Sequence, residues 1–549
     1  TQNVVVGQSA GAAMTTGGQN TVIGTNAGDA LTDADFNVAM GYLALSADTL
    51  GSKSVAIGTS ALRNQNLTTA TNTFNTAVGH DAGQAVTTGT NNTLIGGLAG
   101  DALTISSHNV VIGYNALSAD TKGELNIAIG SGALAAQNFT STTYPANVAV
   151  GHLAGTAVTT GIDNTIIGGL AGDALTDADY NVAVGKSALS ADTLGSKSVA
   201  IGTYALLAQN FTTATDAFNT AVGTYAGAAV TTGTNNTLIG RAAGVAVTTG
   251  TSNTLIGGLA GDALTAANEN VAVGQNALTS DTLGSQCTAI GRGTLTNQNF
   301  TTATNAMNTA VGFNAGGAVT TGVENTLIGG LAGDALTDAD HNVAIGSYTL
   351  TSDTLGSRSV AIGHGALVNQ NFTTATNAYN VAIGYIAGTS VTTGDANTLI
   401  GSLAGDSLTT GVVNVALGYN ALAAATNSKT NTAIGAQALI NFNNTSTVVA
   451  DNTAVGYNSG SGLTTGLYNT LIGATAGDAL TTGEKNVAVG KDALSGGTTY
   501  DGNTAIGWEA LKVADNTSGS DGNNVAVGAN CGAAVSSGIR NVLIGVSAG

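Results

Sequence analysis

Polar and apolar positions follow one another along this chain in a five-residue unit that returns 31 times. Each unit opens with a polar residue, continues with three mostly small or β-branched apolar residues, and closes with glycine. An example is Asn20-Thr21-Val22-Ile23-Gly24. β-Branched residues favour strands, whereas Asn and Gly favour turns. Because no 3.6-residue period accompanies the many Gly, Thr and Asn residues, the pattern predicts short strands followed by bends, and not helices.

The spacing of the closing glycines is regular. Most successive glycines are separated by a 17-residue step, and every fourth step is a 21-residue one, as between Gly58 and Gly79. Three shorter steps and one longer step make a 72-residue supercycle, to which one additional 17-residue unit is added between Gly240 and Gly257. A fixed period of this kind predicts an all-β parallel β-solenoid of 17- and 21-residue coils with about 31 rungs. Because the chain begins and ends inside the repeat, we expect residues 1–549 to be one continuous solenoid shaft, a fragment of a longer protein.

The strand of each unit is apolar on both faces. In the unit that spans residues 181–185, Val182 and Val184 share one face and Ala183 takes the other. One face can fill the inside of its own coil, but the other face still needs cover. Association of chains along that face supplies the cover, and symmetric closure favours a cyclic homotrimer.

Asparagine opens 27 of the 31 units. Stacked asparagine side chains can form a hydrogen-bonded amide ladder along the solenoid, and glycine permits the bend that follows each strand. The four exceptions, which all fall in one phase of the supercycle, are Ser54, Ser198, Cys287 and Ser359. The residues that we assign to the structural ladder are Asn20, Asn37, Asn92, Asn181, Gly24, Gly41, Gly96 and Gly185.

Composition narrows the possible partners. Charged residues make up 8% of the chain and the formal net charge is −19. A chain without a basic stripe cannot neutralise phosphates, so we expect no nucleic-acid partner and no charge-driven binding to anionic membranes. The absence of an uninterrupted apolar run of about 18 residues predicts no membrane insertion. The two cysteines, Cys287 and Cys531, occupy positions where other repeats carry small residues, which predicts burial.

The sequence offers little catalytic chemistry, and we expect no enzyme activity. Its five histidines form no short-range pair of metal-ligand spacing. Seven aspartates recur at the supercycle, and we interpret them as a solvated acidic edge: Asp29, Asp101, Asp173, Asp262, Asp334, Asp406 and Asp478. Nearby Asp33 and Asp35 could assist a Ca²⁺ site, which would need six or more oxygen ligands. We otherwise expect no cofactor and no metal.

The 21-residue coil is the best candidate for a contact surface. Its additional residues fall in a stretch that recurs in several supercycles, with an apolar residue at its centre that we expect to pin the longer loop to the coil. The residues of this candidate contact loop are Gln209, Asn210, Phe211, Thr212 and Thr213. A ridge of such loops could touch a surface receptor.

The repeated unit resembles the head repeats of trimeric autotransporter adhesins. Close matches to the family motif are Asn126-Ile127-Ala128-Ile129-Gly130 and Ser198-Val199-Ala200-Ile201-Gly202. Longer phrases, such as the one at residues 92–104, resemble repeats in the tail fibres of phages, especially marine ones. The resemblance covers the whole chain and implies a trimer of left-handed parallel β-rolls. The coils here are longer than is typical of adhesin heads, so the shape of the loops cannot be carried over.

These observations together predict a non-enzymatic structural fibre. We expect the shaft of a phage tail fibre that presents a receptor-binding tip for host attachment, located in a virion tail fibre or otherwise outside the cell. The alternatives are the head of a trimeric cell-surface adhesin and an extracellular matrix filament. The expected partners are further copies of the chain and a host or matrix surface receptor.

Overall fold

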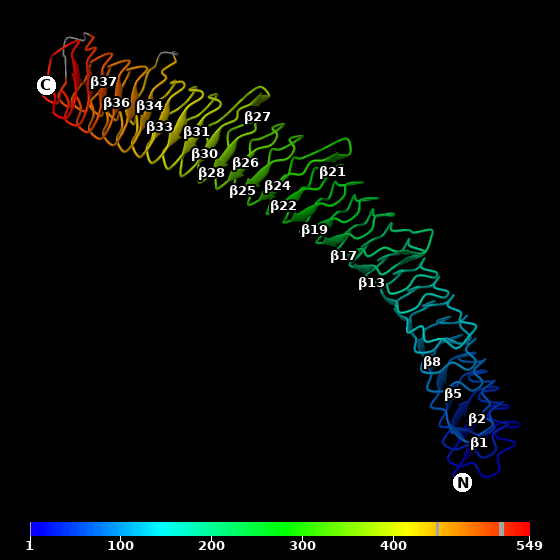
Figure 1. The fold of residues 1–549 in the computed structure, drawn as a ribbon. Coiled ribbons are helices and arrows are strands. Elements are labelled where there is room, and N and C mark those ends of the chain that lie inside the picture. The colour runs from blue at the N-terminus through cyan, green and yellow to red at the C-terminus, as the bar shows by residue number, and fades with distance from the viewer. Residues whose placement is uncertain (1, 446–448, 515–520) are drawn as a thin grey trace. The chain divides into compact units, whose positions relative to one another are not determined.

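The computed structural model describes residues 2–445, 449–514 and 521–549. The chain forms two compact units, residues 1–270 and residues 271–549. Each unit is a stack of coils in which one three-residue strand per coil lies beside the strand of the next coil (Figure 1). The predicted all-β parallel solenoid is therefore confirmed, with 31 such strands in the part of the chain that the structure describes.

The stacked strands of the first unit are β1 (Val4–Val6), β2 (Thr21–Ile23), β3 (Val38–Met40), β5 (Val55–Ile57), β7 (Thr76–Val78), β8 (Thr93–Ile95), β9 (Val110–Ile112), β10 (Ile127–Ile129), β11 (Val148–Val150), β12 (Thr165–Ile167), β13 (Val182–Val184), β15 (Val199–Ile201), β17 (Thr220–Val222), β18 (Thr237–Ile239) and β19 (Thr254–Ile256).

Those of the second unit are β20 (Val271–Val273), β22 (Thr288–Ile290), β24 (Thr309–Val311), β25 (Thr326–Ile328), β26 (Val343–Ile345), β28 (Val360–Ile362), β30 (Val381–Ile383), β31 (Thr398–Ile400), β32 (Val415–Leu417), β33 (Thr432–Ile434), β34 (Thr453–Val455), β35 (Thr470–Ile472), β36 (Val487–Val489), β37 (Thr504–Ile506), β38 (Val525–Val527) and β39 (Val542–Ile544).

Parallel pairing holds the same register across the shorter and the longer coils. Ala183 of β13 lies beside Ala200 of β15 after a shorter step, and Ala200 lies beside Ala221 of β17 after a longer one. The additional residues of the longer step are therefore accommodated outside the strand stack.

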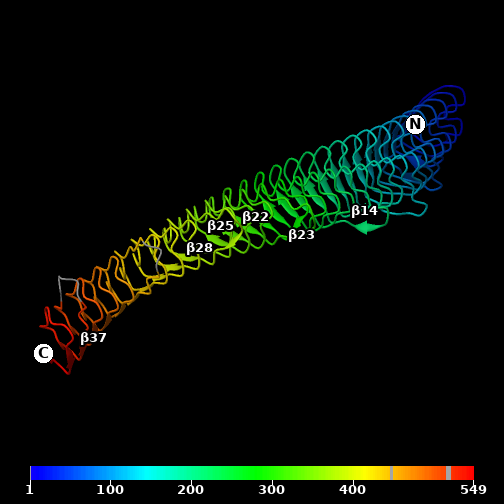
Figure 2. The same cartoon turned by 90° about the horizontal axis from the view of Figure 1, so that it is seen from above.

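Four of the longer coils carry small two-stranded sheets, each of which pairs two residues of one coil with two residues of the loop in the next. The pairs are β4 (Gly51–Ser52) with β6 (Thr71–Asn72), β14 (Gly195–Ser196) with β16 (Thr215–Asp216), β21 (Gly284–Ser285) with β23 (Thr304–Asn305), and β27 (Gly356–Ser357) with β29 (Thr376–Asn377). These sheets stand out from neighbouring coils, as is visible at β21 and β27 in Figure 1 and at β14 in Figure 2.

Bulky core side chains occupy different positions in successive coils, so that a large residue of one coil faces a small residue of the next. A Cβ atom on Gly83 would lie 2.5 Å from Leu94 Cδ1 and 3.1 Å from Leu62 Cδ2. Gly83 therefore leaves room for leucines that enter from the coils on either side, and buried Val86 fills the remaining space. Close packing of this kind explains why a coil resembles the coil one supercycle away more than its own neighbour.

Candidate functional surfaces

The buried asparagines form a ladder that is bonded mainly to the backbone. Asn20 Oδ1 accepts a hydrogen bond from the backbone N–H of Asn37 (2.9 Å), and Asn20 Nδ2 donates to the carbonyl of Ala34 (2.8 Å). Asn37, Asn92 and Asn181 are fully buried and make the equivalent pairs of contacts. Asparagine suits this position because its amide carries both a donor and an acceptor, and buried backbone groups must be paired.

The closing glycines stack directly on one another. Gly24, Gly41, Gly96 and Gly185 have φ values of 132, 139, 133 and 134°. A Cβ atom on Gly24 would lie only 2.5 Å from the carbonyl oxygen of Gly41. Both the backbone conformation and the close approach of the next coil therefore require glycine at this position.

A buried aspartate organises the 21-residue coil, and the sequence pattern did not single it out. Asp192 is fully buried, and its Oδ1 accepts hydrogen bonds from the N–H groups of Gly195 (3.0 Å) and Phe211 (3.1 Å). Its Oδ2 accepts from Gln209 Nε2 at 2.6 Å. One carboxylate thus fixes the start of the long loop to the preceding coil, which offsets part of the cost of burying its charge.

Gln209 also joins the ladder in a coil whose motif opens with serine. Its Nε2 lies 3.0 Å from Ser198 Oγ, and its Oε1 accepts from Asn219 Nδ2 at 2.9 Å. The glutamine amide thereby makes a ladder contact that an asparagine side chain makes elsewhere. Gln137 makes the same contact to Asn147 in a coil whose motif opens with Asn126.

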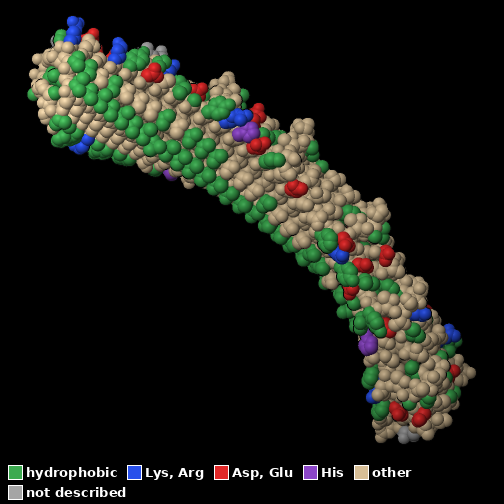
Figure 3. Space-filling model, viewed as in Figure 1, with side chains coloured by type: hydrophobic (Ala, Val, Ile, Leu, Met, Phe, Trp, Pro, Cys, Tyr) green, Lys and Arg blue, Asp and Glu red, His purple; other side chains and the backbone are tan. Residues whose placement is uncertain are grey.

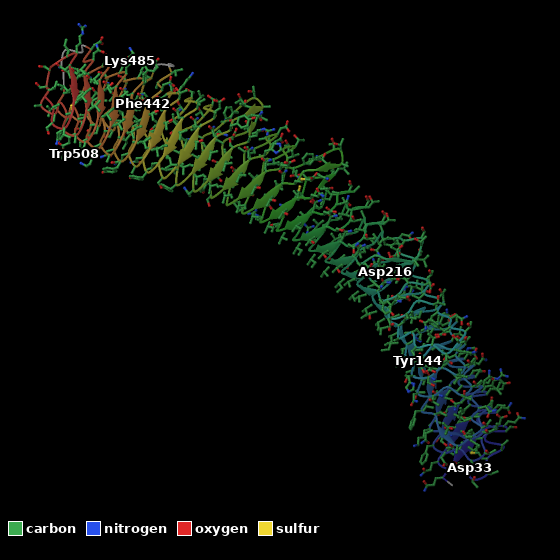
Figure 4. All side chains as sticks on the ribbon, viewed as in Figure 1. Asp33, Tyr144, Asp216, Phe442, Lys485 and Trp508 are labelled. Atoms are coloured by element: carbon green, nitrogen blue, oxygen red, sulfur yellow. The ribbon has the colours of Figure 1, made fainter. Side chains whose placement is uncertain are left out.

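The same Asp–Gln pairing recurs in other long coils at one fixed spacing. The pairs are Asp48 with Gln65, Asp120 with Gln137, Asp192 with Gln209, Asp281 with Gln298, and Asp353 with Gln370. In the next supercycle the matching positions hold Ala425 and Phe442, which are both fully buried. Figure 4 labels Phe442 within the coil stack. The polar pair is thus replaced as a whole by an apolar pair. The fixed spacing of the Asp and Gln residues is the signal in the sequence by which the polar pair could have been found.

The predicted contact loop divides into two sets. Gln209 and Phe211 are buried, which corrects their assignment to a contact surface and shows that the apolar residue pins the loop. Asn210, Thr212 and Thr213 are exposed. The loop therefore presents small polar side chains on an anchored base, and receptor contact through them stays a prediction.

The outward face of the strand stack carries an apolar column along each unit. The third residue of every described strand in the stack is Val, Ile, Leu or Met, whereas the first residue is Thr in 15 of the 31 strands and Val or Ile in the others. The first and third residues of each strand point outward; Val182 and Val184 of β13 are half-buried, and Ile201 of β15 is 38% exposed. Within the second unit, Figure 3 shows these side chains as a green band along the strand-bearing edge. Ala183 is fully buried inside its own coil, so its face is the one that the coil fills, and Val182 and Val184 lie on the face that needs cover.

Both cysteines are buried, as predicted, and neither is in a disulfide. Cys287 replaces the serine of its phase, and Gln298 Nε2 lies 3.1 Å from its Sγ. Burial raises the pKa of the Cys287 thiol to about 11, so the reactive thiolate is scarce at neutral pH. Cys531 Sγ donates to the carbonyl of Leu543 at 3.2 Å. Both residues act as small core side chains.

The acidic and imidazole groups do not gather into a metal centre in the part of the chain that the structure describes, where no three His, Cys, Asp or Glu side chains are suitably grouped. Asp33 accepts a hydrogen bond from Thr16 Oγ1, and Asp35 Oδ1 accepts from the N–H of Gly18 at 2.7 Å. His80 and His341 each pair with one carboxylate, Asp81 at 3.0 Å and Glu324 at 3.1 Å.

The aspartates that recur at the supercycle are less solvated than we predicted. Their Oδ1 atoms are buried without a hydrogen-bond partner at Asp29, Asp101, Asp173, Asp334, Asp406 and Asp478. Desolvation by burial is the main cause that raises the pKa of five of these carboxyl groups, at Asp101, Asp173, Asp334, Asp406 and Asp478. They therefore belong to the wall of the coil and not to a freely hydrated edge.

Among the described residues, no helix has the length and apolar character needed to cross a membrane. No protein-family model matches this chain, and a search of the curated proteins finds no similar sequence. The class of protein is defined by the fold itself, which is that of a β-solenoid repeat protein.

Proposed function

We propose that this chain forms the non-enzymatic shaft of an extracellular fibre, assembled as a parallel homotrimer. The shaft holds a receptor-binding tip away from its point of attachment, as in a phage tail fibre. The observation that carries the proposal is the outward strand face, on which the third strand residue is apolar in coil after coil of each unit. Monomeric soluble proteins rarely leave so long an apolar surface open to water.

Copies of the same chain are the partner that this face fits best. The outward side chains recur once per rung, about 4.8 Å apart. A partner that covers them over many coils must present side chains at the same spacing, and a second copy in parallel register does so. Rotational symmetry then closes the assembly. Three copies is the number implied by the resemblance to autotransporter adhesin heads and phage fibres.

A mass measurement tests the assembly. The native protein should have three times the chain mass of 53.2 kDa. A cysteine introduced at outward-facing Ile201 should form a disulfide between copies under oxidising conditions, because equivalent residues meet near the symmetry axis. The matched control is Thr213→Cys on the exposed loop, which should stay uncrosslinked. A stable, soluble monomer would contradict the proposal.

The second candidate is the head of a trimeric surface adhesin, and an extracellular matrix filament is a third. All three candidate functions would use the same coils, so the coding sequence on either side of these residues distinguishes between them. A particle-attachment domain or a self-cleaving folding chaperone supports the phage fibre. A signal peptide together with a membrane barrel supports the adhesin.

A further inference from the structure

One position of the coil forms a ridge that the proposed shaft function does not use. This ridge position is the residue immediately before the polar residue that opens each strand. It has the left-handed backbone conformation in coil after coil, with φ of 58° at Asn91 and 60° at Asn235, for example. Asparagine, serine and other polar residues fill the position in many coils, so the fold does not require an aromatic side chain there.

Aromatic residues nevertheless occupy the ridge in a fixed arrangement. On three consecutive coils an aromatic ring, a cation and a second aromatic ring follow one another. The aromatic–cation triads are Phe36, Lys53 and Phe74; Tyr180, Lys197 and Phe218; and His341, Arg358 and Tyr379. The first two triads lie two supercycles apart, and the supercycle between them carries His108, Leu125 and Ala146 instead. The triad is therefore a feature that particular coils possess.

The Phe and Tyr rings of the triads are exposed, and two of them contact a cation. Phe36, Phe74, Tyr180, Phe218 and Tyr379 each expose between 51% and 55% of their surface. The ammonium group of Lys53 lies 5.1 Å from the ring centroid of Phe74, and that of Lys197 lies 5.4 Å from the ring of Phe218. These cation–π contacts occupy one face of a ring in each of these two triads and orient that ring, so that its opposite face is presented at little entropic cost.

Hydrogen-bonding groups surround the rings. A surface hollow of about 360 Å³ beside Phe36 is lined by Gln2, Gly18, Gln19 and Asp35. In the second triad, Lys197 Nζ pairs with Asp216 Oδ2 at 2.6 Å, and Figure 4 labels Asp216 at the surface of the first unit.

In the third triad, Arg358 Nε donates to Asn377 Oδ1 at 3.0 Å. Each triad thus combines apolar ring faces with amide or carboxylate groups at their edges.

We propose that the aromatic–cation triads are binding platforms for a neutral polysaccharide. A pyranose ring has an apolar C–H face that stacks on an aromatic ring, and hydroxyl groups at its edge that bond to amides and carboxylates. The two aromatic residues of one triad are two rungs apart, about 10 Å, which lets one extended glycan chain contact both. The net charge of −19 and the carboxylates beside the rings disfavour polyanionic ligands.

The test uses the whole chain and arrayed oligosaccharides of glucose, galactose and mannose, together with counterparts that contain uronic acid. A five-site variant replaces Phe36, Phe74, Tyr180, Phe218 and Tyr379 with Asn, the residue that the ridge already holds at Asn91 and Asn235. We expect the unaltered protein to bind neutral oligosaccharides and the variant to bind at least about tenfold more weakly, because stacking on the rings is lost.

The matched control removes five exposed aromatic residues that follow the strand glycines, by substitution with Asn at Tyr42, Tyr114, Phe313, Tyr419 and Tyr457. This variant should bind as the unaltered protein does. Failure to bind any neutral oligosaccharide at millimolar concentration, preference for the acidic set, or equal loss in both variants would overturn the proposal. The mass measurement decides the trimer independently, so the two proposals can fail separately.

Discussion

Leucine side chains reach the core of many coils from a backbone conformation that L-residues usually avoid. Leu117 and Leu189 have φ values of 46 and 52°, and both are fully buried. A left-handed conformation costs a bulky residue about 1–2 kcal/mol, whereas burying a leucine side chain contributes about 1.5–3 kcal/mol. Packing therefore offsets the local strain, and a local preference drawn from the sequence cannot predict this conformation.

Two adjacent glycines offer a test of the close approach between coils. A Cβ atom on Gly168, whose φ is 138°, would lie 2.5 Å from the carbonyl oxygen of Gly185, whereas one on Gly169 would meet no atom within 4 Å. Gly168→Ala should destabilise its coil by several kcal/mol and lower the amide-exchange protection of β12 and β13.

The neighbouring substitution Gly169→Ala is the control and should leave protection unchanged or raise it slightly, by about 0.4–1 kcal/mol, through the unfolded state. Equal effects of the two substitutions would show that the stacked carbonyl does not restrict this position.

At the scale of elements, the 21-residue coil depends on an exchangeable pair. Its loop is anchored by Asp192 with Gln209 in one supercycle, and the matching positions hold Ala425 with Phe442 in another. The exposed appearance of the Gln209 stretch in the sequence arises from its polar composition. The sequence alone could not distinguish buried from exposed polar residues in this stretch, because Asp192, the partner of Gln209, lies in the preceding coil.

The Asp192–Gln209 pair predicts that a substitution at Gln209 weakens the loop of its 21-residue coil selectively. Gln209→Leu removes the Nε2 donor to Asp192 and the Oε1 acceptor for Asn219, which leaves a buried carboxylate short of a partner. We expect amides of residues 194–217 to lose about 1–3 kcal/mol of protection in hydrogen exchange.

Two further variants complete this experiment. Thr212→Ala, on the exposed part of the loop, should change nothing. The double variant Asp192→Ala with Gln209→Phe reproduces the apolar pair and should cost less than Gln209→Leu alone. A double variant less stable than the single one would contradict the view that the two residues act as a unit.

At the scale of the whole molecule, the fold was largely predictable because the regular spacing of the closing glycines reveals the repeat. The 17- and 21-residue steps located the strands. The ladder positions could be recognised because they hold asparagine and glycine. The covered face of the strand was not predictable, since alanine and valine are both apolar and only the path of the coil places Ala183 inside. The ridge triads were missed because their residues are dispersed over three coils and align only after folding.

Equivalence of the coils predicts that a whole supercycle can be removed. Deletion of residues 75–146 joins Phe74 to Asn147, so that β11 follows β5 with Asn147 in the place of Asn75. The product should fold, remain trimeric, and be four rungs shorter, about 19 Å. Circular dichroism and native mass measure the outcome.

Deletion of residues 75–147, one residue more, is the control. It shifts the register by one, which turns every inward side chain of the next strand outward and should disrupt the junction. If both deletions folded equally well, the register would not be set by the ladder and glycine columns.

The stacking of coils in one register also affects how the gene can change in length. Similar coils imply similar stretches of gene, and recombination between misaligned stretches adds or removes coils in whole numbers. The additional 17-residue unit between Gly240 and Gly257 has the form of such an event. A product that keeps the glycine column intact and large core residues opposite small ones folds without further change. Length is then a trait that selection can adjust in single steps, while the chemistry of each coil stays as it was.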